Sequence, residues 1–546
     1  MKQWLKFGIA ICLTFILAGI SFWWATNLRS SFHNYSTPFS LSREIITAHQ
    51  PVSPPLTQRV VLVVIDGLEN NRTVEMPFLH ALQQEGAYLQ LTSQPPFETK
   101  PNYALLSSGS WPEINGVITT DFGGPLPVDN IFRRIAEAGF STSAAAHQWW
   151  RQLNGNYFTP DSFFYPTNDR LDRALDQKIY RQSLDFIQKA EAQFILVHFS
   201  AVAGKNVKEL DQLIAGLAQE LDWSLDTLII TANQQGDMAP CIAIGKGITP
   251  GHHQPANQVD LTTTITALLG ISPPTEAQGR ILWEIISAPA PIRAALEIAR
   301  GQVLGEFMAA YVSQLGYAQL TRETLSESAL LLDEARRFSK AAVYESAWQK
   351  AQAATINLLT LAEKVQTDKI WRGRWLRLPL VLVILAILIF VIHRLDRRQK
   401  GVLFISALLY ALAYFFFSSL LFNKPLSFPD LASANYSALI KPIAIPAYLS
   451  LILVFSGLWL LRLHSHLLLG FCGTYIWLLL LILTGFLCNG IQVTWYLPDP
   501  YLSATTLAAL YQITLLAPGI LFTIVIPWQR KYPPHKEEAG LDQNQV

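Results

Sequence analysis

The chain has 546 residues, of which 51% are hydrophobic and only 15% are charged. A typical soluble domain has about 25% charged residues, so this composition indicates a substantial membrane part. The formal net charge of +1 gives no support to nucleic acid or to a strongly acidic partner. Three of the four cysteines lie in strongly apolar segments, and the single one left elsewhere, Cys241, excludes a disulfide framework in that region.

The N-terminal apolar run, from about Phe7 to Trp24, follows two lysines and is long enough to span a bilayer. A cleavable signal peptide is the alternative, but no convincing small-x-small cleavage pattern follows the run. We therefore predict an N-terminal signal anchor over residues 1–29. Residues 30–58 are polar and contain several prolines, which is typical of a linker.

The next segment, VVLVVIDGL, is an apolar run that ends at Asp66 and Gly67. Such a run predicts a buried parallel strand that brings the Asp66 carboxylate to the carboxyl edge of a sheet, where open α/β folds place their chemistry. Further on, Thr99, Lys100 and Asn102 come immediately before a helical pattern. A hydroxyl and several backbone N–H groups at a helix N-terminus are suited to a phosphate.

Strand and helix patterns alternate through residues 59–288. A helix is predicted near Met76–Glu85. Phe194–Ser200 and Thr227–Asn233 predict strands on either side of an amphipathic helix from about Val207 to Leu221. This alternation predicts an α/β domain with a mostly parallel sheet covered by helices on both faces.

Helical periodicity with few helix breakers continues through residues 289–370 and predicts two or three long amphipathic helices that form a stalk. Residues 371–530 hold five further apolar segments that are long enough to cross a bilayer, and residues 531–546 form a polar cytoplasmic tail. The five segments are about Trp375–Ile392, Gly401–Phe422, Ile443–Leu461, Leu467–Cys488 and Thr505–Ile526.

The charges between the spans predict the orientation of the chain. Four basic residues between Arg394 and Lys400 follow the second span, whereas the loop from Asn489 to Ser503 has no lysine or arginine. By the positive-inside rule, both termini are cytoplasmic and the large domain is extracytoplasmic, although basic residues near Arg372 oppose this slightly. No Asp, Glu or Lys lies in the middle of a span, which favours an anchor or a lipid-contacting bundle over a pump.

Three motifs in this order, VVLVVIDGLENN, TKPN and VDLTTTITALLG, resemble the alkaline phosphatase superfamily. The resemblance covers about Arg59–Trp283 and is in particular to the nucleotide pyrophosphatase/phosphodiesterase branch and the membrane-bound GPI ethanolamine-phosphate transferases. It implies an alkaline-phosphatase-like fold, zinc or another divalent metal, and phosphoester chemistry. By motif position, it implies that Asp66 is a metal ligand, Thr99 the nucleophile and Asn102 a hydrogen-bond donor to the phosphoryl oxygen. Without that chemistry, Thr99 would cap a helix and Asn102 would be an ordinary residue of its first turn.

Most of the other metal ligands that the resemblance implies are missing. Where the family has Asp-x-x-Gly-His, this chain has Ala201 and Lys205 at the Asp and His positions, and where it has Asp-His-Gly, this chain has Asn233 and Gln234. Neutral amides bind zinc poorly and the Lys205 ammonium would repel a cation, so the sequence predicts a degenerate metal site. Alternatively, Lys205 replaces the lost positive charge by pairing with Asp66 or with a bound phosphate.

Five other residues are weaker candidates, each with a structural alternative. His252 and His253 could be a displaced ligand pair, although neighbouring residues in a loop more often face different ways. His198 alternates with apolar residues on a predicted strand and is expected to be a hydrogen-bonded core residue. Asp237 could replace the missing carboxylate, and Asp121 could line the cleft or stabilise a turn.

These observations predict a membrane-anchored protein whose extracytoplasmic domain has lost its catalytic site and acts by binding. The expected ligand is a membrane lipid, a phosphorylated head group or a glycan, and not a nucleic acid. The alternative is an active phosphodiesterase or phosphotransferase that uses Thr99 with an atypical metal site. A third hypothesis is a structural membrane component in which the spans are the functional part.

Overall fold

The computed structural model describes residues 2–39, 51–167, 173–200, 207–233, 238–422 and 436–523. The chain divides into two compact units, which we call the sheet unit and the helical unit. The sheet unit comprises Tyr35–Trp371 and Trp495–Leu497, and the helical unit comprises Met1–Asn34, Arg372–Thr494 and Pro498–Val546.

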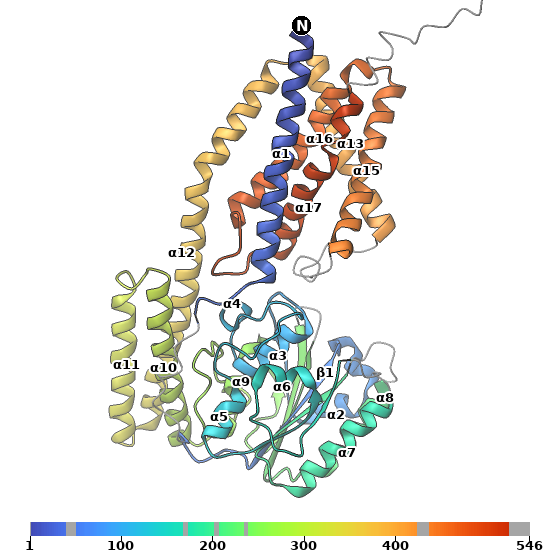
Figure 1. Ribbon diagram of the computed structural model, residues 1–546. Coiled ribbons are helices and arrows are strands. Elements are labelled where there is room, and N and C mark those ends of the chain that lie inside the picture. The colour runs from blue at the N-terminus through green and yellow to red at the C-terminus, as the bar shows by residue number, and fades with distance from the viewer. Residues whose placement is uncertain are drawn as a thin grey trace, which may run out of the picture. The chain divides into compact units, whose positions relative to one another are not determined.

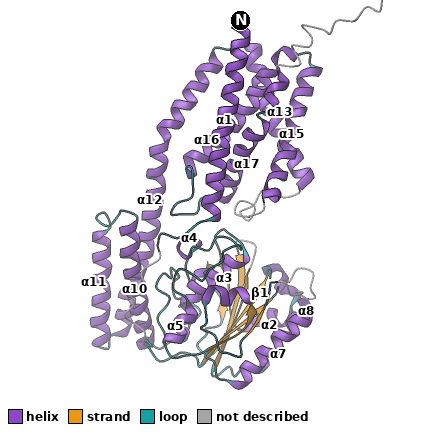
Figure 2. Cartoon of the chain, viewed as in Figure 1, coloured by secondary structure: helices purple, strands orange, loops and turns teal. Residues whose placement is uncertain are grey.

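A mixed, mostly parallel sheet forms the centre of the sheet unit (Figure 2). In spatial order its strands are β4 (Phe163–Tyr165), β3 (Thr142–His147), β5 (Phe194–Phe199), β1 (Arg59–Asp66), β6 (Asp226–Asn233), β7 (Met238–Gly245), β2 (Ala87–Thr92) and β8 (Gly251–His252), and β9 (Ala256–Asn257) also pairs with β2. The strands from β4 to β6 are parallel to their neighbours, whereas β7 is antiparallel to both β6 and β2. The predicted α/β class is therefore confirmed, and the antiparallel part of the sheet is a feature that the sequence patterns did not reveal.

Helices cover both faces of this sheet (Figure 1). On one face, α2 (Pro77–Glu85) and α7 (Arg173–Lys189) contact α8 (Val207–Gln219). On the other face, α3 (Thr99–Ser108) contacts the short helix α4 (Pro112–Asn115), α5 (Ile131–Glu137), α6 (Gln148–Asn154) and α9 (Gln258–Leu268). The predicted helix near Met76–Glu85 is confirmed and ends at Gly86, and a single 3-10 helix, η2 (Asn70–Glu75), precedes it.

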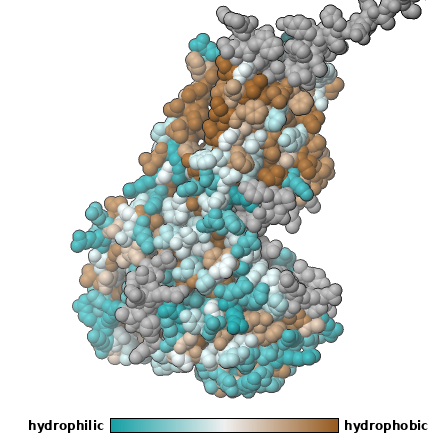
Figure 3. Space-filling model, in the orientation of Figure 1, coloured by the Kyte–Doolittle hydropathy of each residue, from teal (hydrophilic) through white to brown (hydrophobic). Residues whose placement is uncertain are grey.

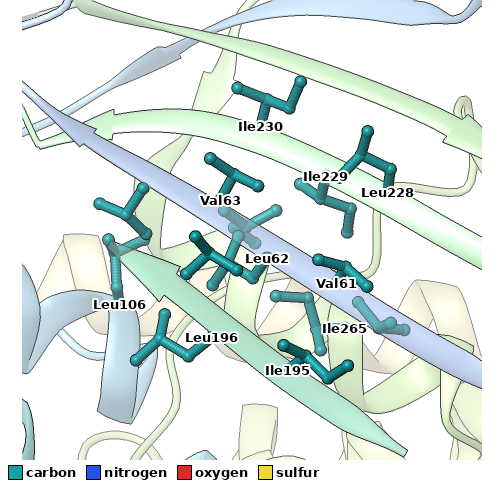
Figure 4. Packing of buried hydrophobic residues seen from close by; sticks show 14 of the residues in the cluster. Val61, Leu62, Val63, Leu106, Ile195, Leu196, Leu228, Ile229, Ile230 and Ile265 are labelled. Carbon is teal, nitrogen blue, oxygen red and sulfur yellow. The ribbon is translucent and has the colours of Figure 1, made fainter. Parts of the chain in front are cut away.

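The core of the sheet unit is built on β1, whose residues from Arg59 to Ile65 are all buried. Figure 4 shows Val61, Leu62 and Val63 of β1 packed between aliphatic side chains of β5 and β6 and those of helices α3 and α9. Burying a valine or leucine side chain contributes about 1.5–3 kcal/mol, so this packing fixes the position of the strand that ends at Asp66.

The last part of the predicted linker belongs to the sheet unit. The backbone N–H of Leu56 donates to the carbonyl of Leu268 at 2.8 Å, and the hydroxyl of Thr57 donates to the carbonyl of Leu225 at 2.8 Å. Leu56 is itself buried in the core. Residues 51–58 therefore pack on the sheet unit near the end of α9, where the burial of Leu56 and the backbone hydrogen bonds hold them.

Two or three long helices are predicted for residues 289–370, and the structure has three there: α10 (Ala290–Gln314), α11 (Arg322–Lys340) and the first part of α12 (Tyr344–His393). Small residues such as Ala335, Ala351 and Ala354 are buried where α11 and α12 meet. Helix α12 continues without a break into the first of the predicted C-terminal spans, and Pro379 lies inside it.

The helical unit consists of α1 (Lys2–His33), the end of α12, α13 (Arg397–Phe422), α15 (Tyr436–Leu460), the short η3 (His464–His466), α16 (Leu467–Asn489) and α17 (Pro500–Leu516). Hydrophobic side chains cover much of its surface (Figure 3). Within the described residues, five helices, namely α1, α12, α13, α15 and α16, are long and apolar enough to cross a membrane.

The sixth predicted span, Thr505–Ile526, corresponds to α17, which has 17 residues. This helix is shorter than a membrane span of about 20 residues requires, and the end of the predicted segment lies outside the described residues. Helix α17 contacts α1, α15 and α16, and most of its side chains are buried among them.

Candidate functional site

Three neighbouring strands bring polar residues together at the carboxyl edge of the sheet. Asp66 is the last residue of β1, and Asn233, the last residue of β6, lies directly opposite it in the strand register. On the other side of β1, His198 of β5 is paired with Val64. The carboxyl ends of parallel strands meet at one edge, which explains how residues so far apart in the chain meet.

The Asp66 carboxylate accepts hydrogen bonds from three different side chains. The Asn233 amide nitrogen donates to Oδ1 at 2.8 Å, and His198 Nε2 lies 3.0 Å from the same oxygen. The Tyr103 hydroxyl, from α3, lies 3.2 Å from Oδ2. The Asp66 side chain is 18% exposed, so these contacts satisfy most of a carboxylate that has little access to water.

His198 is fully buried and is fixed in one orientation. Its Nδ1 contacts the Tyr165 hydroxyl at 2.8 Å and accepts from the backbone N–H of His147 at 3.4 Å. A carboxylate can only accept, so Nε2 carries the proton that points to Asp66. His198 is therefore a hydrogen-bonded core residue, as predicted. One of its hydrogen-bond partners is Asp66 of the candidate site.

Aromatic rings form one wall of this site. The Tyr103 ring stacks on Trp150 with a centroid distance of 4.5 Å and an angle of 19°. Burial, together with the Asp66 charge, raises the pKa of Tyr103 well above its usual value, so its hydroxyl stays protonated and donates. Burial, with the nearby His198 and Lys100, lowers the pKa of His147 to about 4, so this ring is neutral.

Thr99 is the first residue of α3, and the capping position before it is occupied by Glu98. The prediction that these residues lie in a loop before the helix is wrong, and so is the alternative that Thr99 caps it, because Thr99 already has helical geometry. Thr99 lies one turn before Tyr103 and therefore on the same side of α3. Asn102 is buried, and its backbone N–H donates to the Glu98 carbonyl at 3.1 Å.

Lys100 lies beside Thr99 and is almost completely buried. Its Nζ donates to the Phe122 carbonyl at 2.7 Å and lies 4.7 Å from the centre of the Trp149 ring. Burial lowers the pKa of Lys100, and the exposed Asp121 opposes this effect. Asp121 therefore lies in a turn and acts on Lys100 through its charge.

The structure separates two of the weaker candidates from this site. His252 ends β8 and packs against Tyr88, and His253 follows it. Four strand spacings separate β8 from β1, a distance on the order of 19 Å. The hypothesis that these histidines are displaced ligands next to Asp66 is therefore wrong, because they belong to or follow β8, the outermost strand of the sheet, far from β1. Ala201, Lys205, Gln234 and Asp237 lie outside the described residues.

Tyr103, Tyr165 and His147 are the residues of the site that the sequence reasoning missed. Tyr103 could have been found from its position one helical turn after Thr99. Tyr165 and His147 come from β4 and β3, and only the strand order places them beside His198.

The described side chains that contact Asp66 are hydrogen-bond donors and not further carboxylates. Both carboxylate oxygens are engaged by N–H or O–H donors, and the Asn233 amide presents its hydrogens where a ligand oxygen would be needed. Within the described ranges, no group of three or more His, Cys, Asp or Glu side chains is placed to hold a metal ion. Zinc sites in proteins use at least three such side chains.

Comparison with known proteins gives the family. Residues 60–233 match the type I phosphodiesterase/nucleotide pyrophosphatase family. GPI ethanolamine phosphate transferase 3, catalytic subunit, of Mus musculus is 23% identical over an alignment of 288 residues, with 43% of this chain and 26% of that protein covered. GPI ethanolamine phosphate transferase 2, catalytic subunit, of Homo sapiens is 22% identical over an alignment of 321 residues, with 49% of this chain and 32% of that protein covered. The match thus spans less than a third of these relatives.

Two solved structures also show a distant similarity to this chain. Human ectonucleotide pyrophosphatase/phosphodiesterase 5 has 14% identity and a TM-score of 0.33, with 40% of this chain and 96% of that chain covered. A protein in the alkaline phosphatase superfamily from Vibrio parahaemolyticus has 15% identity and a TM-score of 0.35, with 48% and 79% covered.

The sheet unit therefore contains a domain of the alkaline phosphatase superfamily. Within that superfamily the domain is of the type I phosphodiesterase kind, and the GPI ethanolamine phosphate transferases are its distant homologues.

Proposed function

We propose that this chain is a membrane-anchored protein whose site around Asp66 and the start of α3 binds a phosphorylated lipid head group and does not turn it over. The domain family and the names of the distant homologues, which specify ethanolamine phosphate transfer, support this ligand class. The candidate membrane spans support the location of the ligand at a membrane surface.

The observation that carries the proposal is the hydrogen bonding of Asp66. A carboxylate that serves a cation must offer it free oxygen lone pairs. Here Asn233, His198 and Tyr103 take those positions. Asn233 in particular donates where the family pattern has an acceptor, which supports loss of metal-dependent chemistry at this edge of the sheet.

Lys100 supports retention of phosphate binding. Lys100 is the second residue of α3, and a helix N-terminus favours an anion through its backbone N–H groups and dipole. Since Phe122 and Trp149 hold the side chain, little of its rotamer freedom remains to be lost when a phosphate binds.

Binding of phosphoethanolamine to the full-length chain in detergent tests the proposal, with isothermal titration calorimetry as the readout. We expect binding to persist in a chelator and to weaken at least tenfold in Lys100→Met. Lys178→Met is the matched control, because Lys178 also lies over an aromatic ring, 4.2 Å from that of Phe163, but on α7. Hydrolysis of a generic phosphodiester that is abolished by both Thr99→Ala and chelation would overturn the proposal.

A specific observation favours an active enzyme as the second candidate. The Thr99 hydroxyl is partly exposed, and among the described residues it makes no hydrogen bond that would hold it away from a substrate. In that case its oxygen would attack phosphorus, the bond to the leaving oxygen would break, and the departing alcohol would take up the hydroxyl proton. A phosphothreonine at Thr99, detected by mass spectrometry after incubation with a phosphodiester, would support this candidate. One or two equivalents of tightly held zinc or manganese in the purified protein would support it as well.

A further inference from the structure

A cavity of about 570 Å³ lies within the helical unit, between α13, α16 and α17. This volume is in the usual range for small-molecule sites. The side chains on its wall that can form hydrogen bonds are Tyr414, Ser418, Ser419, Trp477, Tyr501, Thr505 and Gln512. Phe415 and Tyr501, which also line it, are 74% and 66% exposed, so the cavity reaches the surface of the unit.

Gln512 is the side chain that gives this cavity a chemical preference. It is only 2% exposed, and its Oε1 accepts from the Tyr410 hydroxyl at 2.6 Å. This contact fixes the orientation of the amide, so the two N–H donors of Nε2 remain for the cavity. Among the described residues nothing accepts from them.

An unpaired donor buried in this way is unfavourable. Gln512 is almost completely buried, and a buried polar group without a hydrogen-bond partner loses the hydrogen bonds that it would make to water. The cavity therefore favours an occupant that is apolar and brings one oxygen acceptor.

We propose that this cavity binds one glycerophospholipid, with an acyl chain between α13 and α16 and an ester carbonyl that accepts from Gln512. The apolar wall matches the chain, and Gln512 matches the carbonyl. This proposal rests on insertion of the helical unit in a membrane. It is independent of the phosphate binding proposed for the sheet unit, so either proposal can fail without the other.

Native mass spectrometry of the full-length chain, released from nanodiscs into increasing detergent, tests this site. Nanodiscs of ester-linked phosphatidylcholine are compared with nanodiscs of the ether-linked analogue, which lacks the carbonyl. We expect one ester lipid to be retained and the ether lipid to be retained about tenfold less, the value of one good hydrogen bond at 1.4 kcal/mol per factor of ten. Gln512→Leu is expected to reduce retention of the ester lipid to the level of the ether lipid.

Two further variants keep the test decisive if Gln512→Leu folds poorly. Ala508→Phe fills the cavity without removing a polar group, and we expect it to expel the lipid. Thr484→Val is the control, since Thr484 lies on α16 outside the cavity and donates to its own helix at Leu480. Equal retention of ester and ether lipid, or retention unchanged by Ala508→Phe in a chain of normal thermal stability, would overturn the proposal.

Discussion

At the scale of single residues, Asn233 occupies one hydrogen-bonding position of the Asp66 carboxylate. Its amide donates to Asp66 Oδ1 at 2.8 Å, so a carboxylate at the same position would place two negative charges in contact. Like charges this close cannot both stay ionised unless a cation lies between them. Asn233, which is neutral, therefore contacts Asp66 through a hydrogen bond without such a repulsion.

We predict that Asn233→Asp destabilises the protein by about 2 kcal/mol in the presence of a chelator. Millimolar manganese or zinc should recover part of the loss, because ligand binding to the folded state raises its stability. The measurement is thermal unfolding in detergent with and without metal. A variant as stable as the wild type in the chelator would show that Asn233 does not have this role.

His147 gives the sheet unit a defined response to acid. Burial lowers its pKa to about 4, whereas an unfolded histidine titrates near 6.5. A depressed histidine pKa means that the folded state binds the proton less well than the unfolded state. The stability that this ring contributes is therefore fully present above about pH 6.5 and is lost as the pH falls toward 4.

We predict that His147→Asn reduces this acid sensitivity. The asparagine side chain can still accept the hydrogen bond that the backbone N–H of Trp149 donates to His147 Nδ1 at 3.1 Å. Between pH 7 and pH 4 the wild type should lose up to about 3 kcal/mol more than the variant. Thermal unfolding followed by circular dichroism at several pH values checks this. His80→Asn, at an exposed position on α2, is the control and should follow the wild type.

At the scale of elements, the helices and strands that were predicted correctly are those whose side chains are most regularly buried. Strand β1 was predictable because all its residues but Asp66 are buried, so its apolar run is continuous. Helix α2 was predictable from its periodicity and from Gly86. The antiparallel direction of β7 relative to β2 was not predictable. Strand direction depends on how the strands are connected, and the spacing of apolar residues is the same in both directions.

The motif VDLTTTITALLG forms α9, and its start is fixed by a reciprocal cap. The side chain of Asn257 accepts from the backbone of Asp260, and Asp260 Oδ2 accepts from the Asn257 N–H at 2.9 Å. Asp260 Oδ1 also accepts from the N–H of Arg280 at 2.8 Å. The cap therefore joins the start of α9 to the loop that follows this helix.

We predict that Asn257→Ala costs about 1 kcal/mol, the usual value of a lost N-cap. The readout is thiol labelling of Cys241 during mild denaturation, in a chain whose other three cysteines are replaced. Cys241 is buried on β7, and burial raises its pKa to about 12, so it reacts only when the sheet opens. Gln254→Ala, at an exposed position shortly before the cap, should leave the labelling midpoint unchanged.

At the scale of the whole molecule, the family could be recognised from the sequence, but the state of the site could not. Asp66 and Asn233 are visible as motif positions, and their direct contact was not predictable from them. The contribution of Tyr103 and His198 to Asp66 depends on how α3 packs over β1 and β5. The spacing of apolar residues predicts which helices and strands form, but it does not predict which of their side chains meet.

The orientation of the chain in the membrane is the prediction that involves every part of the molecule. The basic residues between Arg394 and Lys400, at the junction of α12 and α13, predict a cytoplasmic position. The loop after Asn489 has no lysine or arginine and predicts the opposite side. Gln399 and Gln492 lie in these two regions, and Gln492 is exposed. Single cysteines at these positions, in a chain without its native cysteines, therefore report the two sides of the membrane.

We predict that Gln492→Cys reacts with a membrane-impermeant maleimide in intact cells, and that Gln399→Cys reacts only after the membrane is opened. Gln84→Cys, at an exposed position on α2 of the sheet unit, should react like Gln492→Cys, because the sheet unit and the loop after α16 are expected on the same side. Labelling of Gln84→Cys together with Gln399→Cys would instead place the phosphodiesterase domain in the cytoplasm. Lipid head groups of the outer leaflet would then be out of its reach, and the proposed ligand would have to come from the inner leaflet.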